Sequence, residues 1–304
     1  MDHPLPRSLA DAAYALLLPG EQRAPVVFAS PHSGQDYPAA FVAAARLDSL
    51  ALRRSEDSFV DELFAAAPAA GAPLLAARFP RAYCDPNREP WELDPAMFED
   101  ALPPWVNTTS PRVGAGLGTI ARVVSSGEMI YRRKLSFAEA EQRVRQCWEP
   151  YHEALTSLIA GTRERFGACL LVDCHSMPGG AASVAPERAQ GGVPRVGQSG
   201  RGADIVLGDA HGTACAPRVT RRVEALLASQ GFAVRRNEPY AGGYVTRHYG
   251  RPREGVHALQ IEVSRRLYMD EAAIAKLPGF GAIEARLAAI VQALCAEAGG
   301  LLGL

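Results

Sequence analysis

The stretch at residues 168–178, Ala-Cys-Leu-Leu-Val-Asp-Cys-His-Ser-Met-Pro, constrains the fold more than any other part of the chain. Its apolar run is too short for a helix and ends abruptly in Asp173, His175 and Ser176, just before Pro178 and two glycines. Such a run is typical of a buried strand, and open α/β sheets place their chemistry at the carboxyl ends of strands. His175 is therefore either a ligand or base, or only a polar cap on the strand.

The same arrangement occurs nearer the N-terminus. Residues 25–30 form a compact apolar strand pattern that ends at Pro31, His32, Ser33 and Gly34. Two histidines that follow buried strands of one sheet can converge on a metal ion, because neutral imidazole is a common zinc ligand. The repetition favours a metal site over the alternative, in which each histidine only caps its own strand.

Strand and helix patterns alternate along the chain, which predicts an α/β fold. Helical spacing covers 47–67, 137–158, 218–229 and 281–298. In the second of these helices Ser136 is the expected N-cap, and Pro150 is expected to kink or split it. Further strands are expected at 74–77, 81–85, 204–207, 232–235 and 256–263. No boundary is evident, so we expect a single α/β domain over 1–304, with long loops at 89–120 and 179–214 over a cleft and the glycine-rich segment 179–212 as its most mobile part.

The balance of charge argues against two classes of partner. The chain has 32 basic and 33 acidic residues and a pI near 6.7, which does not suit electrostatic binding to nucleic acid or to a membrane surface. No uninterrupted apolar run approaches the roughly 18 residues of a membrane span. The six cysteines show no Cys-x-x-Cys spacing, so free thiols in a reducing, cytoplasmic setting are the simplest interpretation.

Two groups of carboxylates are candidates for the same site. Glu262 lies inside an apolar strand, on the face that it shares with Gln260. It is either a general base in a cleft or a residue on a solvated face of the sheet. Glu56 and Asp57 either ligate a metal or interact with a helix N-terminus, and the sequence pattern leaves both interpretations open.

Basic residues supply the candidates for binding an anion. Asn87 and Arg88 follow a strand-ending Asp85 and can fork a substrate carboxylate, although Arg88 can equally pair with a nearby glutamate. Arg247 and His248 lie between two turns and fit either a second anion site or ordinary loop packing. His152, in the helical pattern, is expected on the helix surface.

Five segments, in order between residues 25 and 270, resemble the N-formylglutamate amidohydrolase (deformylase) family. They are Ser-Pro-His-Ser-Gly at 30–34, Asp-Pro-Asn-Arg at 85–88, Asp-Cys-His-Ser at 173–176, Gly-Gly-Tyr-Val-Thr-Arg-His-Tyr-Gly at 242–250 and His-Ala-Leu-Gln-Ile-Glu at 257–262. Because the family is related to zinc carboxypeptidases and aspartoacylases, the resemblance implies a three-layer, zinc-carboxypeptidase-like (phosphorylase/hydrolase-like) fold with a mixed central sheet flanked by helices. It also implies metal-dependent hydrolysis of N-formyl-L-glutamate to formate and L-glutamate, a step of bacterial histidine degradation.

The resemblance implies roles for individual residues. His32 and His175 match two ligands of Zn2+ or another divalent metal, and Glu262 matches the general base. The relatives take their third ligand from His-x-x-Glu, but Gln35 stands at that position here, so the role is assigned to Asp57, with Glu56 as the fallback. The remaining roles go to Arg81, which would steady the oxyanion, and to the substrate-binding residues Asn87, Arg88, Arg247 and His248.

The expected substrate is a small dianionic N-acyl amino acid, and a homo-oligomer is compatible with the sequence. Two rival functions differ in what they would show experimentally. A deacylase or carboxypeptidase-like amidase for another N-acyl amino acid or peptide would bind zinc but prefer a different substrate. A non-catalytic binding protein with a vestigial site would bind ligand without turnover, but the complete set of His32, His175 and Glu262 argues against it.

Overall fold

The computed structural model describes residues 13–181 and 202–304, and it contains a seven-stranded sheet in the order β1-β3-β2-β4-β7-β5-β6. Strands β3, β2, β4 and β7 run parallel, whereas β1 and β5 are antiparallel to their neighbours β3 and β7. The predicted mixed central sheet is therefore confirmed. Most of the glycine-rich segment expected to be mobile lies outside the described residues. The strands of this sheet are β1 (Tyr14–Leu17), β2 (Val26–Ser30), β3 (Leu74–Ala77), β4 (Cys169–Met177), β5 (Ile205–Gly208), β6 (Val234–Arg236) and β7 (Val256–Ser264).

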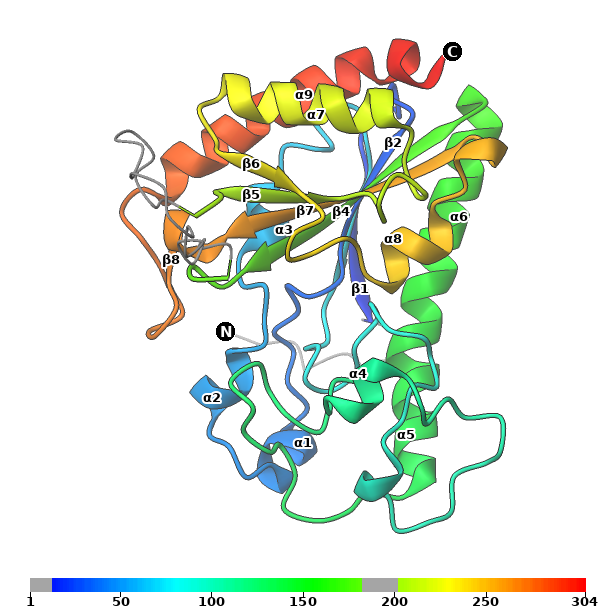
Figure 1. Cartoon of the computed structure of the whole chain (residues 1–304), viewed down its shortest axis with the longest axis vertical. Helices are drawn as coiled ribbons and strands as arrows, with labels where there is room; N and C mark the ends of the chain where they lie inside the picture. Colours follow the sequence, from blue (N-terminus) through cyan, green and yellow to red (C-terminus); the bar gives the residue numbers. More distant parts are fainter. Residues whose placement is uncertain (1–12, 182–201) are drawn as a thin grey trace, which may run out of the picture.

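Helices cover both faces of the sheet, as Figure 1 shows for α7 and α9 on one side and α6 on the other. Successive residues of β4 alternate between two hydrophobic clusters, with Leu170 and Val172 in the cluster that includes α7 and α9, and Leu171 in the cluster that includes α6. This alternation is the period of a strand buried on both faces. The predicted three-layer arrangement is confirmed. The longer helices are α5 (Phe137–Arg143), α6 (Glu149–Phe166), α7 (Pro217–Ser229) and α9 (Phe280–Leu302).

Short helices and loops form the lower half of the molecule in Figure 1 and pack beneath the carboxyl ends of the parallel strands. The expected long loop at 89–120 contains two single turns of helix, and the expected loop at 179–214 contains β5. The remaining short elements are α1 (Ala39–Ala44), α2 (Ser49–Arg53), α3 (Val60–Leu63), the 3-10 turn Pro95–Met97, α4 (Pro111–Gly114), α8 (Tyr244–Tyr249), the 3-10 turns Pro252–Glu254 and Arg265–Leu267, and the hairpin strands β8 (Met269–Asp270) and β9 (Ala275–Lys276).

Two local predictions were wrong. The helix expected over 47–67 is two short helices, α2 and α3, separated by a polar turn. The strand expected at 81–85 is a turn. In both cases tertiary contacts of buried polar side chains, described below, replace the local pattern. Between the two turns expected around 240–250 lies the helix α8, which was not predicted from the sequence.

The long helix near the middle of the chain begins as predicted. Ser136 and Glu139 form a capping box at the N-terminus of α5, in which each side chain accepts a hydrogen bond from the other residue's backbone N–H. Before Pro150, a π-helical turn at Val144–Trp148 joins α5 to α6. The turn gives Pro150 a place in the first turn of α6, where its missing N–H costs little.

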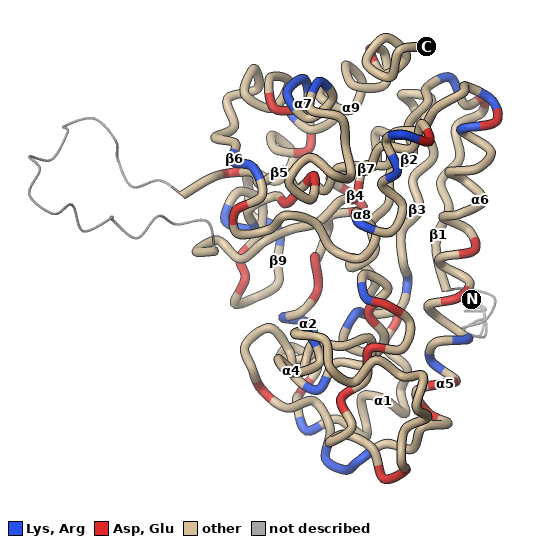
Figure 2. The backbone as a smooth tube through the Cα atoms, turned by 45° about the vertical axis from the view of Figure 1, so that its right-hand side comes forward, with Lys and Arg blue, Asp and Glu red and all other residues tan. Residues whose placement is uncertain are grey.

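Figure 2 shows basic and acidic residues interspersed along the described chain. One helix, α9, is long and apolar enough to cross a membrane by length and composition. However, α9 packs nine buried residues, Phe280 to Leu302, against the sheet and its neighbouring helices, as the core helix of a globular fold does.

Candidate metal and catalytic site

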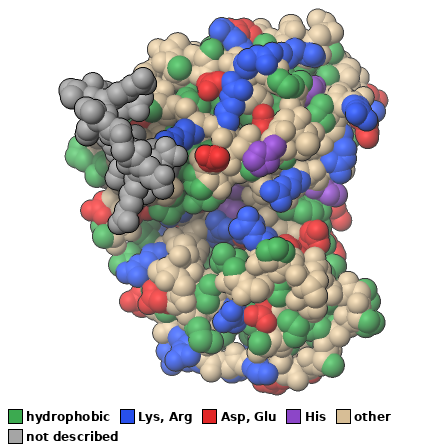
Figure 3. All heavy atoms as spheres, viewed as in Figure 1, with side chains coloured by type: hydrophobic (Ala, Val, Ile, Leu, Met, Phe, Trp, Pro, Cys, Tyr) green, Lys and Arg blue, Asp and Glu red, His purple; other side chains and the backbone are tan. Residues whose placement is uncertain are grey.

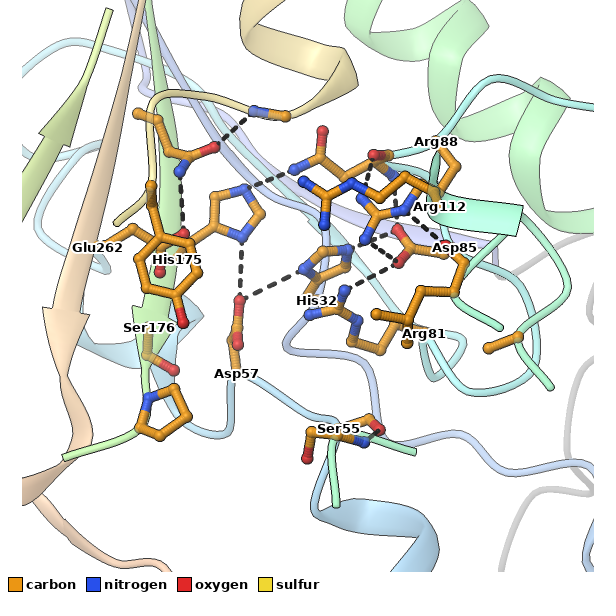
Figure 4. Close-up of a pocket in the computed structure, with 18 of the residues that line it drawn as sticks. His32, Ser55, Asp57, Arg81, Asp85, Arg88, Arg112, His175, Ser176 and Glu262 are labelled. Carbon is orange, nitrogen blue, oxygen red and sulfur yellow. Dashed lines mark hydrogen bonds and ion pairs between the residues drawn. The ribbon is translucent and has the colours of Figure 1, made fainter. Parts of the chain in front are cut away.

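His32, Asp57 and His175 converge on one point at the carboxyl ends of β2 and β4 (Figure 4). The Nδ1 atoms of His175 and His32 lie 3.0 Å and 3.4 Å from Oδ2 of Asp57, and all three residues are at most 2% exposed. His32 Nδ1 is buried and has no hydrogen-bond partner among the described residues. Ligands about 2 Å from a tetrahedral zinc ion lie about 3.3 Å apart. These residues therefore fit a divalent metal ion.

Two carboxylates lie within hydrogen-bond distance of the histidine Nε2 atoms, the ring nitrogens that do not face Asp57. Asp85 Oδ1 lies 2.7 Å from Nε2 of His32, and Asp173 Oδ1 lies 2.9 Å from Nε2 of His175. A proton on each Nε2 leaves Nδ1 as the lone-pair atom, which is the atom that faces Asp57. Burial alone would raise the pKa of Asp85, but the charges of His32, Arg88 and Arg81 hold it well below its usual range. Asp85 is therefore an anion that orients His32.

Asp57 reaches the histidines because the chain is not helical between α2 and α3. Its backbone N–H donates to the carbonyl oxygen of His32 at 3.0 Å, which fixes the turn beside β2. Phe59, with φ of 67°, is left-handed and prevents one continuous helix. Arg265 donates to Oδ1 of Asp57 at 3.0 Å, so Oδ2 is the oxygen that faces the histidines.

Glu56, the fallback ligand, points elsewhere. Its carboxylate accepts hydrogen bonds from Arg53 at 3.0 Å and from Ser58 at 2.8 Å. Although Glu56 is as buried as Asp57, its charge is already paired. The structure therefore places Asp57, and not Glu56, with the two histidines.

Glu262 lies directly beside His175, because the two residues are paired across β4 and β7. Gln260 Nε2 donates to Oε1 of Glu262 at 2.9 Å, which orients the carboxylate. Burial raises the pKa of Glu262 from 4.5 to about 7, and the nearby carboxylates of Asp57 and Asp173 add to the effect. A carboxylate with such a pKa can accept a proton at neutral pH and return it.

A cavity of about 400 Å³ opens in front of these residues, and Figure 3 shows basic side chains along the hollow between the two halves of the molecule. Arg81 donates to Asp85 at 2.9 Å. Arg88 is held by the carbonyl oxygens of Leu117 and Asn87, at 2.8 Å and 2.7 Å. The arginines that line the cavity are Arg81, Arg88, Arg112, Arg247 and Arg265.

Asn87 connects the candidate metal ligands His32, Asp57 and His175, called the metal group below, to α8. Its Oδ1 accepts from the backbone N–H of Val245 at 2.8 Å, and its Nδ2 lies 3.2 Å from Nε2 of His175. A Cβ atom at Gly243 would lie 2.3 Å from Asn87 Nδ2, so only glycine allows α8 to approach this closely. The approach brings Arg247, from the same helix, to the cavity wall.

Comparison with known proteins identifies the family. The N-formylglutamate amidohydrolase family profile matches residues 24–269. The chain belongs to this family. It is similar to the N-formylglutamate deformylases of Pseudomonas aeruginosa, at 31% identity over 83% of this chain and 84% of the relative, and of Pseudomonas putida, at 29% identity over 82% and 83%.

Solved structures agree with the family assignment. The N-formylglutamate amidohydrolase of Ralstonia eutropha JMP134 superposes with a TM-score of 0.84 at 39% identity, covering 94% of this chain and 98% of that one. A protein from Agrobacterium tumefaciens, with a TM-score of 0.59 and 18% identity over 98% and 96% of the two chains, shares the fold. The predicted resemblance to the N-formylglutamate amidohydrolases is confirmed.

Two histidines of this family member lie where the sequence did not place them. His248 is exposed and lies outside the cavity, stacked on Tyr244 with the ring centroids 4.7 Å apart, so the structure gives no support to its predicted role in substrate binding. His152, expected on a helix surface, is 4% exposed and makes two hydrogen bonds of 2.8 Å, to Tyr249 and to the carbonyl oxygen of Pro86. The latter prediction was wrong because α8 and the turn after Asp85 cover that face of α6.

Sequence reasoning missed Arg265 and Arg112. Arg265 follows β7 by one residue and orients Asp57, and its position just beyond a strand end that carries Glu262 is the signal that could have identified it. Arg112 lies in α4, within the expected loop over the cleft, and lines the cavity. No local pattern distinguishes it from other surface arginines.

Proposed function

We propose that this protein hydrolyses N-formyl-L-glutamate to formate and L-glutamate, with Zn2+ or another divalent metal ion held by His32, Asp57 and His175. The observation that carries the proposal is the convergence of three buried ligand atoms beside Glu262, in an arginine-lined cavity of an N-formylglutamate amidohydrolase family member. The names of the two Pseudomonas relatives support the choice of substrate.

A divalent metal at this position would acidify a water molecule and polarise the formyl carbonyl group. Glu262 takes a proton from the attacking water and donates it to the amide nitrogen as the bond between carbon and nitrogen breaks. Its pKa of about 7 suits both transfers. Arg81 lines the same cavity as Glu262, is held by Asp85 and, as a fixed cation, stabilises the negative charge that develops on the formyl oxygen.

The charges that line the cavity support a substrate with two negative charges. Five arginines face three carboxylates, those of Asp57, Asp85 and Glu262, so the arginines leave an excess of two positive charges. In our proposal Asn87 and Arg88 bind one substrate carboxylate and Arg247 contributes to the other. Asp85 forms an ion pair with Arg81, and Asp57 forms one with Arg265, so these two carboxylates are already paired within the protein.

A cytoplasmic location is part of the proposal. All six cysteines are buried free thiols, which supports a reducing compartment. The interspersed charges give no support to a nucleic-acid partner. A homo-oligomer stays a prediction that sedimentation or light scattering can test.

Metal analysis of the purified protein, combined with a hydrolysis panel, tests the function. The panel contains the N-formyl, N-acetyl and N-succinyl derivatives of glutamate and of a neutral amino acid. We expect about one divalent ion per chain and the highest kcat/KM for N-formyl-L-glutamate. Preference for another acyl group would favour the rival deacylase, and ligand-induced stabilisation without turnover would favour a vestigial binding protein.

A further inference from the structure

Arg112 is the cavity arginine that the proposed mechanism leaves without a role. Arg81, Arg88 and Arg265 each donate to a carboxylate or carbonyl oxygen. Among the described residues, Arg112 and Arg247 line the same cavity without an ion pair or a side-chain hydrogen bond. An arginine that faces a cavity without a partner is available to an anionic ligand.

The backbone that carries Arg112 is firmly positioned. Ser110 caps α4 by accepting from the N–H of Val113, a residue that is 3% exposed. The carbonyl oxygen of Arg112 accepts from the N–H of Leu117 at 2.8 Å, and the carbonyl oxygen of Leu117 accepts from the Nε of Arg88 at 2.8 Å. The segment that presents Arg112 is thus directly bonded to the guanidinium group of Arg88.

The proximity of Arg112 to Arg88 concentrates positive charge (Figure 4). Burial lowers the pKa of Arg88, and the charges of Arg81 and Arg112 lower it further, whereas Asp85 opposes this effect. Asp85 also accepts from His32, so its charge is shared. A substrate carboxylate bound at Arg112 would reduce this excess of positive charge.

The chemistry of an N-formyl amino acid divides its two carboxylates between the inner and outer parts of the cavity. The α-carboxylate is one bond from the carbon that bears the scissile nitrogen, so it lies close to the metal group, where Asn87 and the buried Arg88 are. The side-chain carboxylate of glutamate extends two carbons further toward solvent. Arg112 is exposed and belongs to this outer part of the wall.

We propose that Arg112 binds the side-chain carboxylate of the substrate and thereby sets the preference for acidic over neutral N-formyl amino acids. This inference rests on the proposed function. Loss of a charge-assisted hydrogen bond to a single carboxylate lowers affinity by about ten- to a hundredfold.

The test compares Arg112→Gln with the wild type on N-formyl-L-glutamate and on the neutral, isosteric N-formyl-L-glutamine. We expect kcat/KM for the acidic substrate to fall at least about tenfold, mainly through KM, and that for the neutral substrate to stay within about twofold. Arg112→Lys should recover part of the loss. Arg145→Gln, at an exposed arginine on the π-helical turn outside the cavity, is the matched control and should change neither value.

An equal loss on both substrates, or no loss on either, would overturn the role of Arg112. If the wild type hydrolyses neither substrate, the proposed function fails, and binding of glutarate then tests Arg112 separately. We expect glutarate to raise the Tm of the wild type and to raise that of Arg112→Gln much less. A glutarate response that is absent in the wild type, or equal in both proteins, would overturn the proposal.

Discussion

Replacing Glu262 by Gln should make the protein more stable and much less active. The side chain is 7% exposed, and burial raises its pKa from 4.5 to about 7. Glutamine has the same shape, and its Oε1 can still accept from Gln260 Nε2, so the substitution removes the charge without leaving a cavity. The charge itself is what burial makes costly.

The pKa shift sets the size and the pH range of the effect. Because the folded state holds the Glu262 proton more tightly than the unfolded state, the contribution of Glu262 to the free energy of unfolding is largest below pH 4.5 and is lost as the pH rises through about 7. A pKa shift from 4.5 to about 7 corresponds to about 3 kcal/mol in the free energy of unfolding. Glutamine does not titrate, so Glu262→Gln does not lose this stability as the pH rises. Its free energy of unfolding should therefore exceed that of the metal-free wild type by almost nothing at pH 4.5 and by about 3 kcal/mol at pH 8.

Urea unfolding of chelator-treated protein at pH 4.5 and pH 8 measures this difference. Glu153→Gln, at an exposed position on α6, is the control and should give the same stability as the wild type at both pH values. With metal restored, Glu262→Gln should lose about 100- to 10,000-fold in kcat. An advantage that does not grow with pH would refute the assignment of a raised pKa, and a loss of less than about tenfold in kcat would refute the role as general base.

Two further substitutions test the metal group. Asp57→Asn should weaken divalent metal binding by on the order of 100-fold, whereas Glu56→Gln should leave it unchanged, because the Glu56 carboxylate is paired with Arg53. Calorimetric titration of both variants with the metal measures this, and the reverse order of affinities would restore Glu56 as the ligand. Asp85→Asn should weaken metal binding about 10- to 100-fold, because His32 loses the anion at 2.7 Å that orients it. Competition with a chromogenic chelator measures this affinity, and an unchanged value would show that Asp85 does not act through His32.

Much of the fold could be predicted because buried strands and amphipathic helices have strong periodic patterns. Strand β4, which was expected from the apolar run at residues 168–178, is buried along all nine residues, and the capping box at Ser136 begins its helix as expected. The edge strand β1 was missed because it is short, half-exposed and paired only with β3. The turn at 81–85 alternates like a strand, but its Asp85 side chain accepts from the N–H of Asn87 at 2.8 Å, which favours a turn.

The histidines and Glu262 could be predicted because each belongs to a strand or follows one directly, and parallel strands bring their carboxyl ends together. The register of β4 and β7 then places Glu262 beside His175 and Gln260 beside Asp173. The arginines could not be ranked in this way. Arg112 reaches the cavity through a loop whose course depends on long-range contacts, such as that between Thr119 N–H and the carbonyl oxygen of Glu92.

Asp57, the proposed third ligand, shows most clearly why the rest of the site could not be predicted from local sequence patterns. The apolar spacing on both sides of Asp57 predicts one helix, and a helix would point Glu56 and Asp57 in directions 100° apart with no preference between them. The structure decides between them by two long-range contacts, the bond from Asp57 N–H to the carbonyl oxygen of His32 and the bond from Arg265 to Oδ1. Arg265 lies 208 residues from Asp57 along the chain. The carboxylate that we propose as a ligand is thus placed by the bonds of the turn after α2 to His32 and to Arg265, which directly follows β7, and Arg265 should be as necessary for placing Asp57 as the turn itself.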